Sequence, residues 1–361
     1  MDSAKYPLIS ICIPTYNRAS MLKRALQSAL TQDYQNIEVV VSDNASTDGT
    51  QNIVHAFNDP RVRYYRNPYN VGALINFRRA VYDYAQGKYA IFLADDDYFL
   101  DCFYISKAVR LLEDNPHMVF VFSNWRAIKN ETQCHDFLSD LPEIIPGDWL
   151  VYRYFGYDRQ MYGDIYNHWI TGSAIYLYTV VFVRKIVIDI DPLSDNYLDR
   201  DKTFIYTLCM HGSVGFINAV ALVMNYHQQQ ATATAGFEAY LQNLFRKTLD
   251  ITDYMLAQGA PAKLIRKIRF KHLCLELRPM IANTIDQRVN QQDNNSSLWR
   301  IAIKAFKTNP LLLMVFFRYK ILGALLLSVS PRLYNYFKKR FGKNWDYFQA
   351  ISRPSRVRSG G

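Results

Sequence analysis

Residues 89–97 read YAIFLADDD, an apolar run that leads directly into three consecutive aspartates. A run this short has the length of a buried strand rather than of a helix. Comparable strand-like runs lie upstream, at Leu8–Ile13, Ile37–Val41 and Val62–Arg66. Helical patterns lie between and after them, over Ser20–Gln32, around Ile53–Phe57, over Ala73–Ala85 and over Asp101–Asp114. Strands that alternate with helices predict βαβ units and a mostly parallel sheet.

The rest of the chain continues the alternation less regularly. Strand-like runs occur at Met118–Ser123, Ser173–Val183 and Val214–Tyr226, Asp201–His211 is helical, and the pattern turns helical from Gly236 onward. We therefore predict an α/β fold, with a mostly parallel sheet flanked by helices and a helical C-terminal region. The expected domains are residues 1–235, in halves 1–125 and 126–235, and residues 236–361.

Polar loops follow three of the predicted strands. They are Pro14–Arg18, Ser42–Asp48 and Asp95–Asp97. Ligands of open α/β sheets bind outside the carboxyl ends of the strands, so we expect these loops to form one site.

The aspartate loop is the strongest chemical signal. Three adjacent carboxylates repel one another unless a positive charge lies among them. A divalent cation that bridges to phosphate oxygens is a natural partner, because Mg²⁺ and Mn²⁺ prefer oxygen ligands. The alternative for Asp95–Asp97 is a solvated turn in which Asp97 or Asp101 caps the next helix.

The other polar residues allow two interpretations each. Asp43 could accept a hydrogen bond from a base edge or a hydroxyl, Tyr16 could stack on a base, and Arg18 could reach a phosphate. The alternative is that these loops are ordinary turns and helix caps. Asp201 is either a helix cap or a general base. His227 ends an apolar strand and is either structural or a nitrogen ligand for the metal.

Composition narrows the functional classes. Of the net charge of +10, residues 301–361 contribute +11 from twelve basic residues and one acidic residue, and residues 1–300 contribute −1. A basic tail beside a nearly neutral body is not typical of a nucleic-acid reader. Five widely spaced cysteines without a C-x-x-C pair argue against a disulfide framework and a zinc ribbon, and favour a reducing compartment.

Taken in order, these segments resemble family 2 glycosyltransferases, which are inverting enzymes with the GT-A fold that use nucleotide sugars. The resemblance is specific over residues 6–125, looser to about 235, and absent beyond. It rests on Ile11–Arg18, Val39–Thr50, Asn70–Gly72, Gly87–Tyr89 and Phe92–Asp97, the last of which resembles the family's D-x-D element.

The resemblance implies roles for individual residues. Asp43 would bind the base and Asp95 would lie near the ribose and the metal. The other expected donor-binding residues are Pro14, Thr15, Tyr16, Arg18, Asn70 and Asp96. Asp96 or Asp97, with His227, would hold a divalent Mn²⁺ or Mg²⁺ ion. Asp201 would be the catalytic base, although Arg200 replaces the glutamate of the family's pair and leaves Asp199 as a competitor.

The tail suggests where such an enzyme works. Apolar runs at Leu311–Phe317 and Ile321–Leu327, followed by the basic cluster Lys338–Arg340, fit a helix that lies on an anionic membrane. The alternative is a buried helix with a solvated basic end. The expected acceptor is a saccharide, lipid-linked, used in surface polysaccharide assembly, and the expected location is cytoplasmic, peripheral at the inner face of the cell membrane.

Two other functions compete with this interpretation. One is a non-catalytic nucleotide-sugar or polysaccharide-binding protein on the same fold, against which the intact carboxylate set argues. The other is a nucleotidyltransferase, but Pro14–Arg18 lacks the Gly-rich, basic loop expected after its first strand.

Overall fold

The computed structural model describes residues 7–129, 132–134, 141–156, 175–193, 201–226, 249–263 and 265. The chain divides into two compact units, 1–265 and 266–361, whereas the sequence suggested a boundary at 235. The first unit includes a helix over residues 249–257, and the second unit lies outside the described residues. Within the described residues, no helix is both long and apolar enough to span a membrane.

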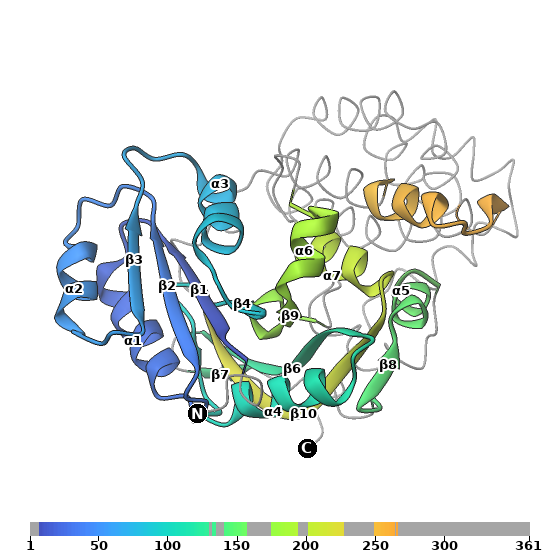
Figure 1. The fold of residues 1–361 in the computed structure, drawn as a ribbon, viewed down its shortest axis with the longest axis horizontal. Helices are drawn as coiled ribbons and strands as arrows, with labels where there is room; N and C mark the ends of the chain where they lie inside the picture. Colours follow the sequence, from blue (N-terminus) through green and yellow to red (C-terminus); the bar gives the residue numbers. More distant parts are fainter. Residues whose placement is uncertain are drawn as a thin grey trace, which may run out of the picture. The chain divides into compact units, whose positions relative to one another are not determined.

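The first half of the sheet follows the predicted alternation of strands and helices (Figure 1). Its elements are β1 (Ile9–Thr15), α1 (Ala19–Leu30), β2 (Ile37–Asp43), α2 (Thr50–Ala56), β3 (Val62–Arg66), α3 (Ala73–Arg78), a π-helical segment (Arg79–Tyr84) and β4 (Tyr89–Phe92). The predicted helix over Ala73–Ala85 therefore changes from α to π geometry at Arg79, and Ala85 N donates to Ala80 O to close it.

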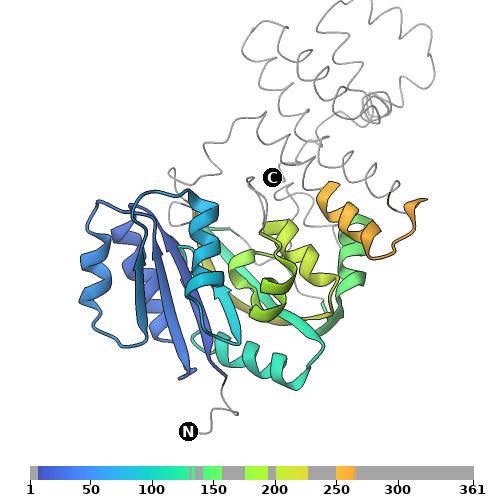
Figure 2. The same ribbon diagram turned by 45° about the horizontal axis from the view of Figure 1, so that its top comes forward.

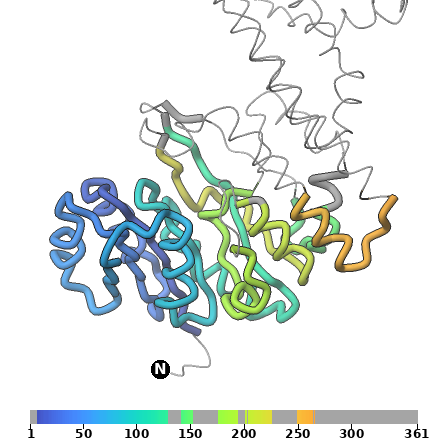
Figure 3. The backbone as a smooth tube through the Cα atoms, turned by 90° about the horizontal axis from the view of Figure 1, so that it is seen from above, coloured from blue at the N-terminus to red at the C-terminus, as the bar shows by residue number. Residues whose placement is uncertain are grey.

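The second half begins directly after the aspartates. Its elements are β5 (Tyr98–Phe99), α4 (Tyr104–Asp114), β6 (Met118–Lys129), β7 (Thr132–Cys134), β8 (Ile144–Pro146), α5 (Gly147–Gly156), a 3₁₀ turn (Leu177–Thr179), β9 (Val181–Val183), α6 (Arg184–Ile190), α7 (Asp201–Cys209) and β10 (Ser213–Tyr226). Figure 3, seen from above, shows this half in green and yellow beside the blue first half.

The sequence predicts a long strand over Ser173–Val183, and the structure describes residues 175–183 of it. Over most of these residues the prediction is wrong. The 3₁₀ turn replaces it, closed by Thr179 N and Thr179 Oγ1, which both donate to Tyr176 O. Tyr104 donates its hydroxyl to Thr179 O and fixes the turn on α4. Only the last three residues, Val181–Val183, pair as strand β9.

The described strands form one sheet in the order β3-β2-β1-β4-β9-β6-β10-β5, with β7 on β6 and β8 on β10. The pairs β1–β2, β1–β4, β2–β3 and β6–β10 are parallel, and β9 runs antiparallel between β4 and β6. This confirms the predicted α/β class. Because β1 to β4 are parallel, their carboxyl ends share one edge of the sheet.

Both faces of the central strands are covered, which explains their continuous apolar sequences. Ile9, Ile11 and Ile13 join a buried cluster with apolar residues of α1 and α4. On the other face, Cys12 contacts Ala80 O of the π segment, and Phe77 of α3 packs on Phe92 of β4. Figures 1 and 2 show α3 on the opposite side of the sheet from α1 and α2. The strand ends that carry the polar loops are therefore fixed from both sides.

Candidate active site at the carboxyl ends of β1, β2 and β4

The three predicted loops meet at one edge of the sheet. Thr15 of β1 is in register with Asp43 of β2, and Cys12 of β1 with Phe92 of β4, so the loop after each strand begins beside the next. Thr15 Oγ1 donates to Asp95 Oδ2 over 2.7 Å, which joins the first loop to the aspartate loop. The three loops therefore lie together at this edge of the sheet, and their role as one binding site remains a prediction.

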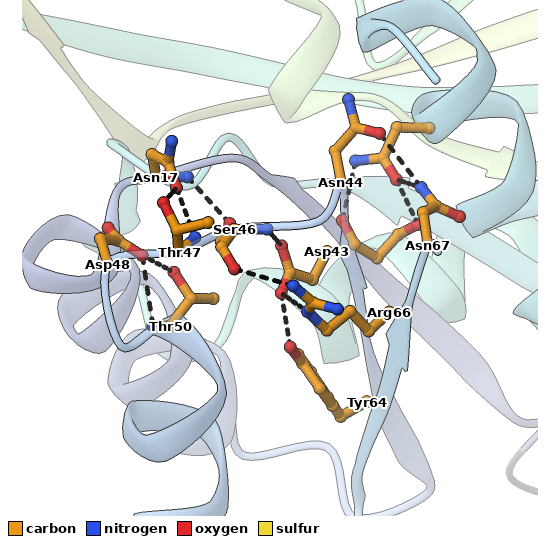
Figure 4. A network of polar contacts seen from close by, with 12 residues as sticks. Asn17, Asp43, Asn44, Ser46, Thr47, Asp48, Thr50, Tyr64, Arg66 and Asn67 are labelled. Carbon is orange, nitrogen blue, oxygen red and sulfur yellow. Dashed lines mark hydrogen bonds and ion pairs between the residues drawn. The ribbon is translucent and has the colours of Figure 1, made fainter. Parts of the chain in front are cut away.

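Asp43 is fully buried, and side chains of β3 hold its carboxylate (Figure 4). Tyr64 donates its hydroxyl to Oδ2, Ser46 N donates to Oδ1 over 2.9 Å, and Arg66 Nε lies 3.8 Å from Oδ2. Burial is the largest cause that raises the pKa of the Tyr64 hydroxyl, and its hydrogen bond to Asp43 is the second. The hydroxyl therefore keeps its proton and remains a donor. Asp43 is thus held by donors to both of its oxygens, each of which can accept one more hydrogen bond, and it lies beside an exposed arginine.

Sequence reasoning missed Tyr64 and Arg66. Arg66 also donates to Ser46 O over 3.1 Å and so supports the loop that follows β2. A signal was available, because β3 is parallel to β2 and its end lies at the same edge of the sheet. The rule that selected the other loops therefore also selects Arg66.

The first two loops are tied together through Asn17 (Figure 4). Thr47 N donates to Asn17 Oδ1 over 2.8 Å, and Asn17 N donates to Ser46 Oγ over 2.9 Å. Asn17 and Ala45 both have positive φ angles, 53° and 66°, which are uncommon for residues with a side chain. Backbone of this kind persists where surrounding bonds enforce it and is frequent at functional sites.

Buried amides hold the next loop, which contains Asn70. Asn76 of α3 donates from Nδ2 to Ser42 O and accepts at Oδ1 from Ser42 Oγ and Asn67 Nδ2. Asn44 accepts from Val71 N and donates to Asn70 Oδ1 over 2.7 Å. Asn70 Oδ1 also accepts from Gly72 N, so the described contacts of Asn70 shape the loop.

Arg18 lies between two of the aspartates. Its Nη1 donates to Asp95 Oδ1 over 2.8 Å and to Asp96 Oδ2 over 3.0 Å. Both carboxylates are nearly buried, with side chains 6% and 7% exposed. Burial raises the pKa of Asp95, the Arg18 charge opposes that shift, and the Asp96 charge adds to it. The guanidinium thus neutralises part of a compact negative site.

Asp97 has a different environment. Tyr176 donates its hydroxyl to Oδ2 over 2.7 Å, and Asn225 N donates to Oδ1 over 3.0 Å. Burial first, and then the charge of Asp96, raise the pKa of Asp97 well above its usual range. Both carboxylate oxygens therefore have protein donors, so Asp97 joins the loop to β10 and to the 3₁₀ turn. As a metal ligand it remains a prediction, and the geometry favours Asp96.

The carboxylates can be tested for their fit to a divalent cation. Among the described residues, no three metal-binding side chains converge on one point. However, oxygens of Asp95 and Asp96 face one common position, the one that Arg18 Nη1 takes. A small set of carboxylate oxygens suits Mg²⁺ or Mn²⁺, which take further ligands from water and substrate phosphates. Asp95 and Asp96 fit such an ion. His227, the predicted nitrogen ligand, lies outside the described residues.

Asp201 is the first residue of α7 and is half-buried. Burial is the main cause that raises the pKa of Tyr178 well above its usual range. The negative charges of Asp201 and of Asp95–Asp97 raise this pKa further. One phenol therefore lies within the field of both groups of carboxylates. Asp199 lies outside the described residues.

Comparisons with known proteins point to one family. Residues 10–176 match the sequence profile of the family described as Glycosyl transferase family 2. The Escherichia coli enzyme WfaP, named UDP-Glc:alpha-D-GlcNAc-diphosphoundecaprenol beta-1,3-glucosyltransferase, is 34% identical over 40% of this chain and 56% of its own length. WfgD from the same species, with the same enzyme name, is 24% identical over 63% of this chain and 80% of its own length.

A solved structure extends the comparison to the fold. TarS residues 1–349 from S. aureus, in complex with UDP, align over 95% of this chain and 89% of that chain with a TM-score of 0.53 and 16% identity. This confirms the GT-A type of fold. The chain spans only 33–56% of the length of several relatives that it matches.

Proposed function

Through residues 10–176 this chain belongs to glycosyl transferase family 2, and on that premise we propose that it is an inverting enzyme that transfers a sugar from a nucleoside-diphosphate sugar to a saccharide acceptor. The observation that carries the proposal is the position of Asp43 at the end of β2 and of Asp95–Asp96 just beyond β4, the two strands that flank β1, on one sheet edge. An oriented buried acceptor suits a base edge, and clustered carboxylates suit a cation-bound diphosphate.

The nucleoside would bind along the loops after β1 and β2. Asp43 supplies the hydrogen-bond acceptor, and Tyr64 and Arg66 keep its carboxylate oriented. Tyr16 is 45% exposed, so its ring is accessible to a base. Pro14 and Thr15 end β1 beside these residues, and Asn70 shapes the neighbouring loop through its bonds to Asn44 and Gly72.

The diphosphate would bind at the aspartate loop. Asp96 would hold a Mn²⁺ or Mg²⁺ ion, with Asp95 beside it and His227 as a further ligand, while Asp97 mainly anchors the loop. Such an ion supplies Lewis-acid neutralisation of the leaving diphosphate. Arg18 would add a second positive charge at the rim of this loop.

Asp201 would act as the base. Its carboxylate would take the proton from the acceptor hydroxyl while the acceptor oxygen bonds to the sugar carbon and the bond to the diphosphate breaks. The shared influence of Asp201 and the aspartate loop on Tyr178 supports a position near the donor. Asp199 is the competing candidate.

The acceptor would be lipid-linked and used in surface polysaccharide biosynthesis. The names of WfaP and WfgD, which contain a diphosphoundecaprenol acceptor, support this class. The apolar and basic tail would hold the enzyme on the anionic inner face of the cell membrane.

The test of the function is a panel of nucleotide sugars. The full-length protein would be incubated with each donor, with Mn²⁺ or Mg²⁺, and with polyprenyl-diphosphate-linked saccharides, and the products analysed by mass spectrometry. We expect one donor to give an acceptor longer by one sugar and a free nucleoside diphosphate. Binding without turnover across the whole panel would favour the non-catalytic alternative. Release of inorganic pyrophosphate in a parallel incubation with nucleoside triphosphates and sugar 1-phosphates would favour a nucleotidyltransferase.

The base has its own test. Asp201→Asn keeps the side-chain shape but removes the proton acceptor, so donor affinity by calorimetry should remain nearly unchanged. Single-turnover transfer should fall by about 10²–10⁴-fold. Asp199→Asn is the matched control and should be mild. If transfer is lost in the Asp199 variant and retained in the Asp201 variant, the base is Asp199.

A further inference from the structure

One nitrogen of Arg18 holds the two carboxylates that face each other in the aspartate loop. Arg18 Nη1 is the shared donor to Asp95 Oδ1 and Asp96 Oδ2, at 2.8 and 3.0 Å. The Arg18 side chain is 23% exposed, so it lies at the rim of the carboxylate cluster rather than beneath it. A guanidinium in this geometry does for the two charges what a bridging cation would do.

Three of the other carboxylate oxygens of the loop have different partners. Asp95 Oδ2 accepts from Thr15 Oγ1, and both oxygens of Asp97 accept from Tyr176 and Asn225. The pair of oxygens that Arg18 holds is therefore the pair oriented toward one common point. Mg²⁺ binds oxygen ligands at about 2.0–2.1 Å, so a cation held by these two oxygens and Nη1 exclude each other from that point.

We propose that Arg18 is a resident counter-ion, which keeps Asp95 and Asp96 together until a divalent cation and a nucleoside diphosphate displace it. This inference rests on the proposed function of the site. The backbone of Arg18 is fixed, because its carbonyl accepts from Met21 N and Leu22 N at the start of α1. The exchange is therefore a movement of the side chain alone.

The exchange links the affinities of two ligands. A cation that arrives alone must break the hydrogen bonds of Arg18 to Asp95 and Asp96 and moves the guanidinium away from both carboxylates. A nucleoside diphosphate offers that guanidinium a new anionic partner and offers the cation further oxygen ligands. Each ligand therefore strengthens the binding of the other by the same factor.

The experiment measures Mn²⁺ affinity by electron paramagnetic resonance of free Mn²⁺, with and without UDP, in full-length native protein and Arg18→Met. Without UDP, the variant should bind Mn²⁺ about 10- to 100-fold more tightly, as expected from loss of charge-assisted hydrogen bonds that compete for the same oxygens. UDP should increase the Mn²⁺ affinity of the native protein by about tenfold or more, and that of the variant much less.

Two further variants separate the exchange from general charge effects. Lys23→Met removes one positive charge from an exposed position on α1 and should leave Mn²⁺ affinity without UDP within about twofold of native. Arg18→Lys keeps the charge but loses the planar fork, so its Mn²⁺ affinity without UDP should lie between that of native protein and that of Arg18→Met.

Thermal unfolding is a second measurement of the exchange. Without metal, Arg18→Met should have a lower Tm than native protein, and Mn²⁺ should raise its Tm by more.

The results distinguish failure of the exchange from failure of the function. If native protein binds Mn²⁺ with UDP but Arg18→Met shows neither tighter Mn²⁺ binding alone nor a larger Tm rise, the exchange is wrong and the function stands. If Lys23→Met tightens Mn²⁺ binding as much as Arg18→Met, a bulk charge effect replaces the exchange. If neither native protein nor Arg18→Met binds Mn²⁺ with UDP, both the exchange and metal-dependent transfer are wrong.

Discussion

Asp96 and Asp97 are adjacent and chemically identical, yet the fold gives them different tasks. Asp97 accepts from a tyrosine and a backbone amide far away in the sequence, Tyr176 and Asn225. Asp96 instead shares Arg18 with Asp95. The sequence could not separate the two, because the partners of Asp97 come from elements that meet it only in the folded sheet.

Substitutions at Asp96 and Asp97 should therefore affect different properties: metal binding at Asp96 and stability at Asp97. Asp97→Ala leaves two buried donors without an acceptor and should lower the free energy of unfolding by about 2–4 kcal/mol, measured by urea titration in EDTA. Asp96→Ala should cost less stability but lose Mn²⁺ binding in the presence of UDP, whereas Asp97→Asn should retain it. Loss of Mn²⁺ binding in a stable Asp97→Asn variant would restore Asp97 as a ligand.

The sequence supplied most residues of the site but not their supports. Asp43, Arg18 and the aspartates stood out because polar residues followed apolar strands. Tyr64 did not, because only the parallel register of β3 with β2 reveals its contact with Asp43, whereas Arg66 could have been selected by its place at the end of β3.

At the scale of elements, Asn76 joins α3 to the end of β2. Asn76→Ala would remove the hydrogen-bond partner of Ser42 O, Ser42 Oγ and Asn67 Nδ2, of which Asn67 Nδ2 keeps Asn44 Oδ1 at 3.3 Å. The free energy of unfolding should fall by about 2–4 kcal/mol, since each buried polar group left unpaired costs on the order of 1–3 kcal/mol.

The affinity for the nucleotide-sugar donor is a second measure of the Asn76 contacts, because they support the loop that contains Asn70. It should decrease in Asn76→Ala, measured by calorimetry at a temperature where the variant is folded. Asn52→Ala, on the exposed side of α2, is the control and should change stability by less than about 0.5 kcal/mol. Equal stability of the two variants would show that the amide cluster does not support the loop.

Elements with a clear local pattern were predictable, and those decided by tertiary contacts were not. Val62–Arg66 is the strand that the sequence indicated, and the helix predicted over Ser20–Gln32 is α1 with its ends shifted. The turn at Leu177–Thr179 was missed, because Tyr104 and the hydrogen bonds within the turn override the β-branched, aromatic sequence around it. The antiparallel insertion of β9 between β4 and β6 likewise has no local signal.

At the scale of the whole molecule, the charge is concentrated at one end of the chain. Residues 301–361 carry a net charge of +11 and lie outside the described residues, so the membrane role of the tail remains a prediction. Replacing Lys338, Lys339 and Arg340 with glutamine should weaken binding to anionic vesicles by about 10²-fold, at about 1 kcal/mol for each charge.

Vesicle sedimentation of the full-length protein measures that effect. Binding to neutral vesicles should be the same for the native protein and the triple variant. Raised salt should weaken native binding to anionic vesicles only partly, because apolar contacts are not screened. Equal sedimentation of both proteins with anionic vesicles would favour a tail that packs within the protein.

The most direct test of the central claim is the metal dependence of sugar transfer by native protein and Asp96→Asn. With the donor and acceptor identified in the panel, native transfer should vanish in EDTA and return with Mn²⁺ or Mg²⁺. At the Mn²⁺ concentration that saturates native protein, Asp96→Asn should transfer about 10²-fold more slowly or worse, because the ion that neutralises the leaving diphosphate is no longer held. Full native transfer in EDTA, or native rates in the Asp96→Asn variant at that Mn²⁺ concentration, would contradict a donor site built on the aspartate loop.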